Sequence, residues 1–467
     1  MERGNNMKEY DIIVAGAGAS GVFLAYELTK IQNSASVLML DKGADLAGRV
    51  CPIKTGKVTN CVKCSPCHIM NGYGGAGTLS DGKYNITTQF GGDLHKYVGT
   101  EKAIELMEYV DEVLCSMGGA DAKLYSTANS DLKTQALRHN LHLLDAKVRH
   151  LGTDRNVQIL GKIYDYIQNR IDMKFKTEVT DIERSEDGTF LVRTNHGDEF
   201  RCKDLVLAAG RSGSKWIAEV CRRFGIEQKS NRVDIGVRVE LPAEVFKHIT
   251  DEVYESKIVY KTDKYNDMVR TFCMNPYGEV VAENTNGIVT VNGHSYADPA
   301  LRTENTNFAL LVSNTFTEPF KNSNEYGESI ARLSNMLGGG VLLQRFGDLV
   351  KGRRSSARRM EKCFTRPTLK ATPGDLSLVI PKRQLDSIIE MIYALDKIAP
   401  GTANEDTLLY GVEVKFYNSK VEVDSSLETK IPGLYALGDG SGVTHSLSQA
   451  SASGVHVARI LAAKYQK

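Results

Sequence analysis

Three glycines near the N-terminus have the spacing of a nucleotide-binding turn. Gly16, Gly18 and Gly21 follow an apolar run, the helical pattern of residues 22–30 comes next, and a second apolar run ends at Asp41. The first glycine permits a tight bend, the second lets the backbone approach a pyrophosphate, and the third lets helix and strand pack. A helix N-terminus favours the phosphate. The pattern therefore predicts dinucleotide binding, with Asp41 accepting hydrogen bonds from a ribose diol.

A second glycine tip lies near the C-terminus and bears on which dinucleotide is bound. Residues 429–440 indicate a turn, a short apolar strand and the tip Gly438-Asp439-Gly440, followed by a small-residue helix over 446–464. This stretch resembles the C-terminal fingerprint of the glutathione-reductase-like flavoproteins. The resemblance implies that Asp439 binds the ribityl chain of FAD and that the helix directs its N-terminus at the flavin pyrimidine, where it stabilises the negative charge of the reduced ring. We expect FAD.

A third stretch, in the middle of the chain, resembles the second FAD fingerprint of the same families. Residues 173–202 alternate in polarity, with turns near Gly188 and Gly197, and run into the apolar segment 204–211. This pattern predicts a three-stranded meander followed by a buried strand. By the resemblance, Val179 contacts the adenine through its backbone.

Four cysteines, Cys51, Cys61, Cys64 and Cys67, precede a glycine-rich loop over residues 72–83. Three interpretations stay open for them. They could hold an iron–sulfur cluster, with Cys51 as a distant fourth ligand and without the usual completion of that motif. Two of the last three could form a redox thiol pair that relays electrons to the flavin. All could instead be free thiols that pack the loop, the interpretation we favour; zinc lacks its two separated cysteine pairs.

The cysteine motif and the glycine loop together resemble the uncharacterised FAD-utilising dehydrogenases, a group distantly similar to geranylgeranyl reductases. The segments 234–238, 270–273 and 438–443 also fit. The resemblance covers nearly the whole chain and implies an oxidoreductase without a defined substrate. In related flavoproteins the loop passes the pyrophosphate and the flavin ring, which implies that Ser80 hydrogen-bonds near N5.

The expected site combines these motifs. Arg49 could touch the FAD phosphates or the adenosine. His445 could donate a proton or hydrogen-bond flavin O2, or could only cap the helix; Cys273, in the expected substrate sheet, could face the flavin or belong to the core. The candidate catalytic residues are His445, Ser80 and Cys273. The residues expected to bind FAD are Gly16, Gly18, Ala19, Ser20, Gly21, Asp41, Lys42, Arg49, Gly74, Gly75, Ala76, Gly77, Ser80, Val179, Ala209, Gly210, Gly438, Asp439, Val443 and Thr444.

The composition excludes several classes of function. The chain has 467 residues, 42% hydrophobic and 25% charged, with a net charge of +1, so it suggests neither a nucleic-acid partner nor a strongly charged membrane surface. No run is apolar and long enough to span a membrane, and the first nine residues are polar. Nine cysteines, an odd number, fit a reducing compartment. We expect a cytoplasmic protein with a small-molecule substrate; the oligomeric state stays open.

The order of the motifs predicts an α/β protein of two domains. A Rossmann-type, glutathione-reductase-like FAD domain is discontinuous, over 7–230 and 408–467, and an α+β substrate domain over 231–407 is inserted. Helices over 101–117 and 131–149 should pack on the FAD domain. In such flavoproteins the inserted domain lies over the isoalloxazine.

The predicted function is hydride transfer between flavin N5 and an organic substrate. The family resemblance favours reduction of an activated C=C bond, or the reverse dehydrogenation. No second glycine turn of this kind is present, which disfavours an NAD(P)H domain, although NAD(P)H could serve as external reductant. A monooxygenase and a non-catalytic electron carrier stay open as alternatives. The basic run 351–359 could receive an acidic substrate or an NADPH phosphate, but a solvated face is the simpler interpretation.

Overall fold

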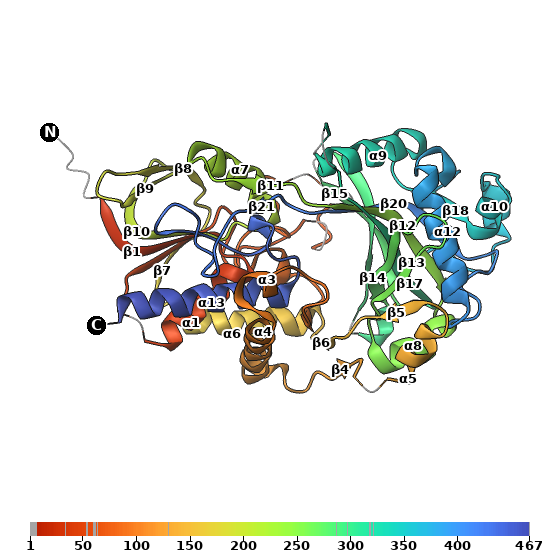
Figure 1. Ribbon diagram of the computed structural model, residues 1–467, viewed down its shortest axis with the longest axis horizontal. Helices are drawn as coiled ribbons and strands as arrows, with labels where there is room; N and C mark the ends of the chain where they lie inside the picture. Colours follow the sequence, from red (N-terminus) through yellow and green to blue (C-terminus); the bar gives the residue numbers. More distant parts are fainter. Residues whose placement is uncertain are drawn as a thin grey trace. The chain divides into compact units, whose positions relative to one another are not determined.

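The computed structural model describes residues 7–32, 34–52, 55–58, 62, 64–128, 130–285, 287–296, 298–316, 319–320 and 322–466. The chain divides into two compact units (Figure 1). Unit 1 comprises Met1–Lys123, Arg149–Lys229 and Asn418–Lys467, and unit 2 comprises Leu124–Val148 and Ser230–Tyr417.

Unit 1 is built on a seven-stranded sheet in which β7-β2-β1-β10-β9-β8 are neighbours and β22 also pairs with β10. Strands β1, β2, β7, β10 and β22 are parallel, and β8 and β9 are antiparallel. Its elements are β1 (Lys8–Ala15), α1 (Ala19–Lys30), β2 (Val37–Leu40), α2 (Gly75–Thr78), β3 (Lys83–Ile86), α3 (His95–Val98), α4 (Thr100–Leu114), α6 (Thr153–Ile167), β7 (Asp172–Lys174), β8 (Val179–Arg184), β9 (Phe190–Thr194), β10 (Glu199–Leu207), α7 (Ser214–Arg223), β11 (Gln228–Lys229), β21 (Lys420–Val421), β22 (Leu434–Ala436) and α13 (Leu447–Tyr465).

Both faces of this sheet are buried, as a parallel sheet requires. Along β1, Ile12 and Val14 join the core formed with α1, α4, α6 and α13, whereas Ile13 and Ala15 join a second core with β8, β9 and α7. In Figure 1 helices α1, α6 and α13 run along one side of the sheet. Alternate residues of one strand thus enter two cores, which explains the unbroken apolar run in the sequence.

Unit 2 is built on an eight-stranded sheet of order β19-β18-β20-β12-β17-β14-β13-β5. Its elements are β4 (Leu124–Ser126), α5 (Asp131–Leu137), β5 (Leu141–Leu143), β12 (Val233–Pro242), α8 (Ala243–Val253), β13 (Ile258–Lys261), β14 (Met268–Asn275), β15 (Glu279–Thr285), β16 (Ile288–His294), β17 (Asn305–Asn314), α9 (Ser323–Gly338), β18 (Leu342–Arg345), α10 (Phe346–Val350), α11 (Ala357–Glu361), β19 (Thr372–Pro373), α12 (Lys382–Asp396) and β20 (Leu408–Phe416); β6 (Lys147–His150) falls where the ranges of the two units meet.

The central strand β12 has two chemically different faces. Val233, Ile235, Val237 and Val239 enter the core that α8, α9 and α12 cover. The alternate residues Asp234, Arg238 and Glu240 are buried on the opposite face. The sheet therefore packs apolar side chains on one side and carries a charged face on the other.

Three sequence-based expectations differ from the structure. The helix expected over 131–149 ends at Leu137, because residues 141–143 form β5 and pair with β13. Residues 408–416, which we expected in the FAD domain, pair with β12 and β18 as β20. The third meander strand and the buried strand after it are one strand, β10. No helix within the described residues is long and apolar enough to span a membrane.

Candidate functional site

The first glycine turn joins β1 to α1, and its glycines are required by space. Gly16 has a φ of +119°, and a Cβ built there would lie 2.4 Å from the carbonyl oxygen of Ala208. A Cβ at Gly21 would lie 2.1 Å from the carbonyl oxygen of Gly16. A side chain at Gly16 would therefore collide with the backbone that follows β10, and one at Gly21 would push α1 away from the turn.

The N-terminus of α1 suits a phosphate. Gly18 precedes the helix, and a Cβ built at Gly18 would have only the Ala208 carbonyl oxygen within 4 Å, at 3.8 Å, so this side of the turn is open. The helix begins with Ala19 and Ser20, and its first turn holds no acidic residue. The positive end of the helix dipole meets no side-chain counter-charge there, as an anion site requires.

Asp41 follows β2, and backbone amides bind its carboxylate. Oδ2 accepts from the N–H of Ala17 at 2.8 Å, and Oδ1 accepts from those of Gly43 at 2.7 Å and Gly72 at 3.0 Å. A carboxylate has about four acceptor positions, and three are used here. Asp41 thus ties the first glycine turn to the second glycine loop, and these three donors leave one of its acceptor positions unused. The sequence alone did not reveal this clamp, because two of its three donors, Ala17 and Gly72, come from distant segments.

The glycine loop that contains α2 lies against the first turn. The N–H of Gly74 donates to the carbonyl oxygen of Ala17 at 2.6 Å, and a Cβ at Gly75 would lie 3.1 Å from Cα of Gly18. Ala76 and Gly77 continue α2, and a Cβ at Gly77 would lie 2.7 Å from Leu447, the first residue of α13. The loop therefore touches the N-termini of two helices.

Ser80 uses its hydroxyl within this loop. Its Oγ donates to the carbonyl oxygen of Gly77 at 2.7 Å and accepts from the N–H of Gly82 at 3.2 Å. A hydroxyl has one proton to donate, so a hydrogen bond to another acceptor would require Ser80 to leave Gly77.

Arg49 holds the start of the same loop. Its guanidinium donates to three carbonyl oxygens, those of His68 at 3.0 Å, Ile69 at 2.6 Å and Tyr73 at 2.5 Å. Only 7% of the residue is exposed, and burial lowers its pKa to about 10. In the structure Arg49 shapes the loop; the sequence had suggested a contact with the cofactor.

Two residues that the sequence analysis missed hold the glycine loop and the segment after β3 by hydrogen bonds to backbone carbonyls. Asn156 of α6 is fully buried, and its Nδ2 donates to the carbonyl oxygens of Gly77 at 2.8 Å and Thr78 at 3.1 Å. Gln449 of α13 donates to the carbonyl oxygens of Thr87 and Phe90 at 3.2 and 3.0 Å. For Asn156, the available signal was a polar residue on an otherwise apolar face of α6.

The tips of β10 and β22 meet beside the first turn. The two strands pair in parallel, with Leu205 opposite Leu434. A Cβ at Gly440 would lie 2.8 Å from the carbonyl oxygen of Gly210, and a Cβ at Gly438 would lie 2.5 Å from Oγ of Ser20. The structure therefore brings Ala209-Gly210 and Gly438-Asp439-Gly440 to the start of α1.

Asp439 forms the centre of the C-terminal tip. Its Oδ1 accepts from Thr444 Oγ1 at 2.9 Å, and its Oδ2 lies 3.6 Å from Nε of Arg211. Val443 and Thr444 are fully buried, and the N–H of His445 donates to the carbonyl oxygen of Gly91 at 2.9 Å. Ser446 caps α13 by accepting from the N–H of Gln449. The sequence order Asp439 to Ser446 thus places an acid, a hydroxyl and a histidine just before a helix N-terminus.

Two further predicted residues lie on the strand side of the site. Val179 begins β8 and is 8% exposed. Lys42 lies 3.9 Å from Glu178 as a loose ion pair. The segment between β7 and β8 is tied to the end of β2, because the N–H of Thr177 donates to the carbonyl oxygen of Asp41 at 2.8 Å.

The cysteine motif is described only in part. Cys61 lies outside the described residues, and Cys51, Cys64 and Cys67 are half-buried with free thiols. Among the residues that the structure describes, no group of three histidine, cysteine or acidic side chains could hold a metal ion. The three interpretations of these cysteines stay predictions.

Cys273 belongs to unit 2, on β14. Its backbone has a φ of +47°, and its carbonyl oxygen accepts from Arg238 Nη1 at 3.0 Å and Asn275 Nδ2 at 2.9 Å. An irregularity in the pairing of β14 with β17 begins at its neighbour Phe272. Cys273 therefore marks a bulge on the charged face of the sheet.

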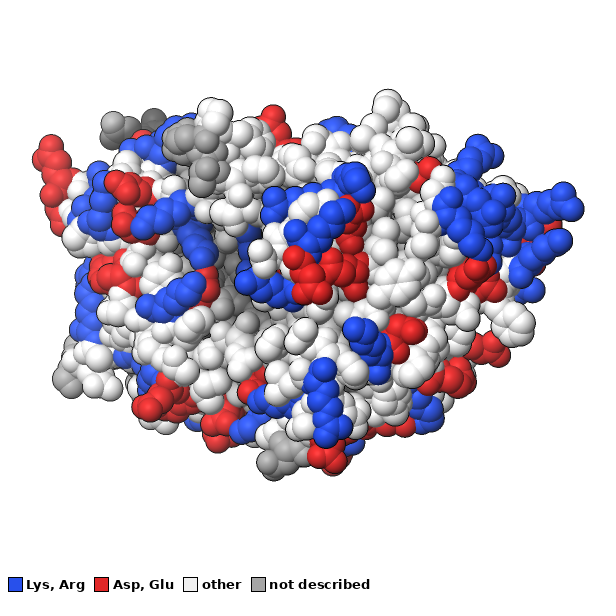
Figure 2. All heavy atoms as spheres, turned by 45° about the vertical axis from the view of Figure 1, so that its right-hand side comes forward, with Lys and Arg blue, Asp and Glu red and all other residues white. Residues whose placement is uncertain are grey.

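The basic run 351–359 is exposed around α10 and α11. Figure 2 shows Lys and Arg side chains gathered on the side of unit 2 where α10 lies. Within this run Arg353 and Arg359 pair with Asp348, and Lys351 pairs with Glu405. These pairs fit the solvated face that the sequence favoured.

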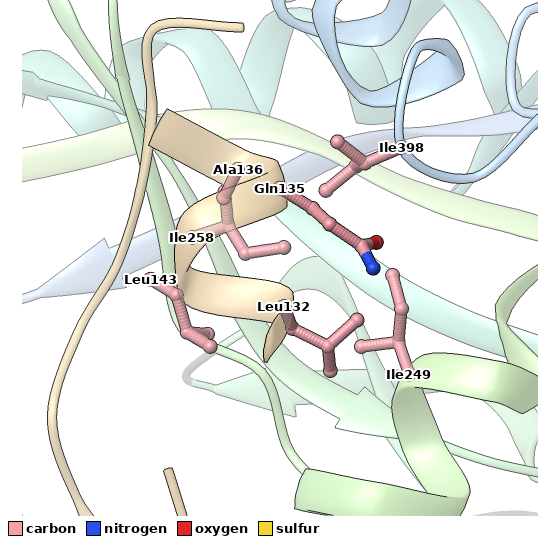
Figure 3. Close-up of a pocket in the computed structure, with 7 residues that line it drawn as sticks. All are labelled: Leu132, Gln135, Ala136, Leu143, Ile249, Ile258 and Ile398. Atoms are coloured by element: carbon pink, nitrogen blue, oxygen red, sulfur yellow. The ribbon is translucent and has the colours of Figure 1, made fainter. Parts of the chain in front are cut away.

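A pocket of unit 2 is too small for a substrate. Leu132, Leu143, Ile249 and other apolar side chains line it with Gln135 (Figure 3). Its volume is about 10 Å³, which is near the lower limit for one water molecule.

Two family models match the chain. Residues 232–416 match the model described as "FAD-dependent protein, C-terminal domain-like", and residues 14–78 match the model of an NAD(P)-binding Rossmann-like domain. The second match covers β1, α1, β2 and the glycine loop through α2, the elements that converge at the site. No curated protein matches the chain.

Several solved structures are similar to the chain. Glycine oxidase from Geobacillus kaustophilus is 13% identical, with 99% of this chain and 96% of that chain covered and a TM-score of 0.42. L-proline dehydrogenase from P. horikoshii is also 13% identical, with 99% and 95% covered and a TM-score of 0.42. The FAD-bound L-alpha-glycerophosphate oxidase from Mycoplasma pneumoniae is 12% identical, with 98% and 96% covered and a TM-score of 0.40.

The family matches agree with the geometry of unit 1, in which a Rossmann-like turn, a glycine loop and two strand tips meet at the start of α1. The chain is an FAD-dependent oxidoreductase.

Proposed function

We propose that the chain transfers a hydride between N5 of FAD and an organic substrate bound by residues 231–407. The preferred reaction is reduction of an activated C=C bond or the reverse dehydrogenation. FAD, when bound, supplies the two-electron chemistry, and the protein supplies binding, orientation and electrostatics. One observation carries the proposal: the glycine tips of the first turn, the α2 loop, β10 and β22 contact one another around the N-terminus of α1.

The reaction class depends on the resemblance to the uncharacterised FAD-utilising dehydrogenases. The motifs that carry the resemblance are the cysteine motif, the glycine loop and the tip at Gly438–Val443. The match of residues 232–416 to an FAD-dependent C-terminal domain is consistent with it.

We assign the following roles within the site. Gly16, Gly18 and the start of α1 hold the pyrophosphate. Asp41 uses its remaining acceptor position for a ribose hydroxyl, and Asp439, held by Thr444, accepts from the ribityl chain.

The remaining residues contact other parts of FAD or position the glycine loop. Val179 meets the adenine through its backbone. His445, one residue before the cap of α13, donates a hydrogen bond or a proton at the flavin pyrimidine edge. Arg49 and Ser80 position the glycine loop, since their polar atoms are committed to its backbone.

The cofactor is tested first. The purified protein should be yellow, and heating should release FAD that chromatography identifies. A colourless protein that FAD cannot reconstitute would overturn the proposal.

The reaction is tested by anaerobic reduction, with dithionite or NAD(P)H, followed by a screen of oxidants. An organic acceptor that reoxidises the flavin faster than oxygen supports hydride transfer. Stoichiometric hydroxylated product would identify a monooxygenase instead. Rapid exchange with a protein partner, without small-molecule turnover, would identify an electron carrier.

A further inference from the structure

We propose that the charged face of the eight-stranded sheet in unit 2 binds an organic carboxylate, and that Glu413 takes up a proton when this anion binds. The inference deepens the proposed function, because it names the substrate class of residues 231–407, and it rests on that function only for this assignment. The binding site itself is argued from side chains of unit 2 alone.

Strand register places the relevant side chains on one face. Residues directly opposite each other on neighbouring strands point to the same side of a sheet. Gly236 of β12 lies opposite Leu311 and Glu413, and Leu311 lies opposite Arg270. In the next row, Arg238, Ala309, Phe272 and Tyr410 are aligned in the same way. Glu413, Arg270, Arg238 and Phe272 therefore share the face opposite the apolar core.

Three cations gather around the ring of Phe272. The ammonium of Lys257 lies 4.1 Å from the ring centroid, and Arg270 and Lys415 lie 4.9 Å from it. Phe272 is half-buried, so part of the residue is exposed beside these cations. Cations at these distances are attracted to an aromatic ring, but they also repel one another. Three of them at one ring create a positive potential that an anion would relieve.

The acids nearby do not fully neutralise the positive charge of this cluster. Arg270 binds Asp234 at 2.5 Å and Tyr417 at 2.7 Å, and Lys257 binds Glu255. The cations of the cluster are Arg232, Arg238, Lys257, Arg270 and Lys415, and the acids are Asp234, Glu255, Glu283 and Glu413. Five positive charges stand against four negative ones, so one positive charge is in excess even when every acid is ionised. Protonation of Glu413 adds a second excess positive charge, which strengthens the attraction for a carboxylate.

Among these acids, Glu413 is the one that we expect to become protonated. It is 5% exposed, and Oε2 has no hydrogen-bond partner among the described residues, although Nε of Arg238 lies 3.3 Å away. Burial raises its pKa to about 7, against Arg238, Lys415 and Lys257, which lower it, and together with Glu283, which raises it further. Arg270 faces the same group. A carboxylate that arrived among these cations would raise the pKa again, so its binding draws a proton to Glu413.

The donors suit a carboxylate on a flat molecule. Arginine and lysine donate charge-assisted hydrogen bonds to carboxylates. The half-buried Phe272 adds apolar surface beside them for the rest of the molecule. Arg238 is held in place, because Nη1 donates to the carbonyl oxygen of Cys273 and Nη2 donates to Asn292 Oδ1 at 2.9 Å. The cluster is thus preorganised by contacts that do not need the ligand.

The test uses the FAD-loaded protein and benzoate as probe, with binding measured by titration calorimetry. Benzoate should bind, and benzamide, which has the same ring without the charge, should bind at least tenfold more weakly. Lys415→Gln should weaken benzoate binding about tenfold. Lys247→Gln removes an exposed charge on α8 of the same unit and should change nothing. Equal binding of benzoate and benzamide, or equal effects of the two lysine variants, would overturn the inference. Inorganic phosphate that binds as tightly as benzoate would also overturn it, because any anion would then suffice.

The number of protons taken up with benzoate is measured by titration calorimetry at pH 8. The titration is run in two buffers of different ionisation enthalpy, because the difference in heat reports the protons that the buffer supplies. The wild-type protein should take up close to one proton per benzoate, because Glu413 is mostly ionised before binding. Glu413→Gln should still bind benzoate but take up almost no proton. Equal uptake in both proteins, or none in the wild type, would overturn the role of Glu413. Loss of benzoate binding in a yellow protein with a normally reducible flavin overturns only this inference, whereas failure to bind FAD overturns the proposed function.

Discussion

Gly454 of α13 packs on the backbone of Ser20 in α1, so closely that a Cβ built at Gly454 would lie 2.1 Å from the Ser20 carbonyl oxygen. The same α1 begins at the glycine turn to which we assign the FAD pyrophosphate. The contact between the two helices therefore lies in the first turn of α1, two residues after Gly18.

This relationship predicts the effect of Gly454→Ala. The methyl group would force α1 and α13 apart, and overpacking of this kind costs about 1–3 kcal/mol. We expect a lower melting temperature and faster FAD release, measured by calorimetry and flavin fluorescence. Gly161→Ala is the matched control, because a Cβ at Gly161 of α6 meets only Leu46 at 3.4 Å. That variant should be neutral or slightly stabilising, since alanine favours a helix over glycine by about 0.5–1 kcal/mol. Similar losses in both variants would contradict the proposed cause.

The hydrogen bonds of Asn156 predict that one substitution would lower both the stability of the protein and its affinity for FAD. Asn156→Ala would remove the amide that donates to the carbonyl oxygens of Gly77 and Thr78. Gly77 keeps its hydrogen bond from Ser80 Oγ, whereas the buried carbonyl oxygen of Thr78 loses this donor, which costs about 1–3 kcal/mol. We expect looser FAD binding, measured as a higher Kd in reconstitution of the apoprotein. Lys162→Ala, on the exposed side of the same helix, should retain FAD like the wild type. A normal Kd for Asn156→Ala would show that the loop does not need this support.

Asp439 should matter more for FAD retention than His445. Asp439→Ala removes the acceptor that we assign to the ribityl chain and also frees Thr444. His445→Ala leaves the backbone hydrogen bond of that residue to Gly91 in place. The FAD content after gel filtration should therefore fall further in Asp439→Ala than in His445→Ala. The reverse order would remove Asp439 from the site.

Local patterns predicted the elements whose partners are close in sequence. The β1-α1-β2 unit follows from two apolar runs and three glycines within a few turns of chain, and the structure confirms it. The helix that the sequence predicts over 131–149 is wrong after Leu137. In the structure, β5 pairs with β13, more than a hundred residues away, and this partner decides its conformation.

In the candidate site, too, local patterns predict only the features that do not depend on distant partners. The glycine tips are recognisable because their backbone geometry demands glycine. The three amide donors of Asp41 and the three carbonyl acceptors of Arg49 come from loops whose positions the sequence does not fix. The charged face of β12 was hidden for another reason: both faces of this strand are buried, so its alternation does not show which side lies in the apolar core.

The raised pKa of Glu413 predicts how the free energy of unfolding changes with pH. Its pKa in the folded protein, about 7, lies above that of an unfolded glutamate, about 4.3. Between these values the folded state binds more protons than the unfolded state, so the free energy of unfolding falls as the pH rises from about 4.5 to 7. Glu413→Gln should lose this contribution to the slope. Melting temperatures of both proteins from pH 5 to pH 8 test it, and their difference should change up to about pH 7 and then level off. A constant difference would mean that the pKa of Glu413 is ordinary.

Replacing Cys61, Cys64 and Cys67 with serine should leave flavin reduction nearly unchanged. The described thiols are half-buried and unpaired, and Arg49 holds the following loop through backbone carbonyls that the substitutions do not touch. Anaerobic titration of the wild-type protein should take up only the two electrons of FAD, since a disulfide would add two more. Metal analysis should find no iron, whereas a cubane cluster would give about four irons per chain and broad visible absorption. Extra electrons or bound iron that the triple variant lacks would assign the cysteines a redox role and overturn the structural interpretation.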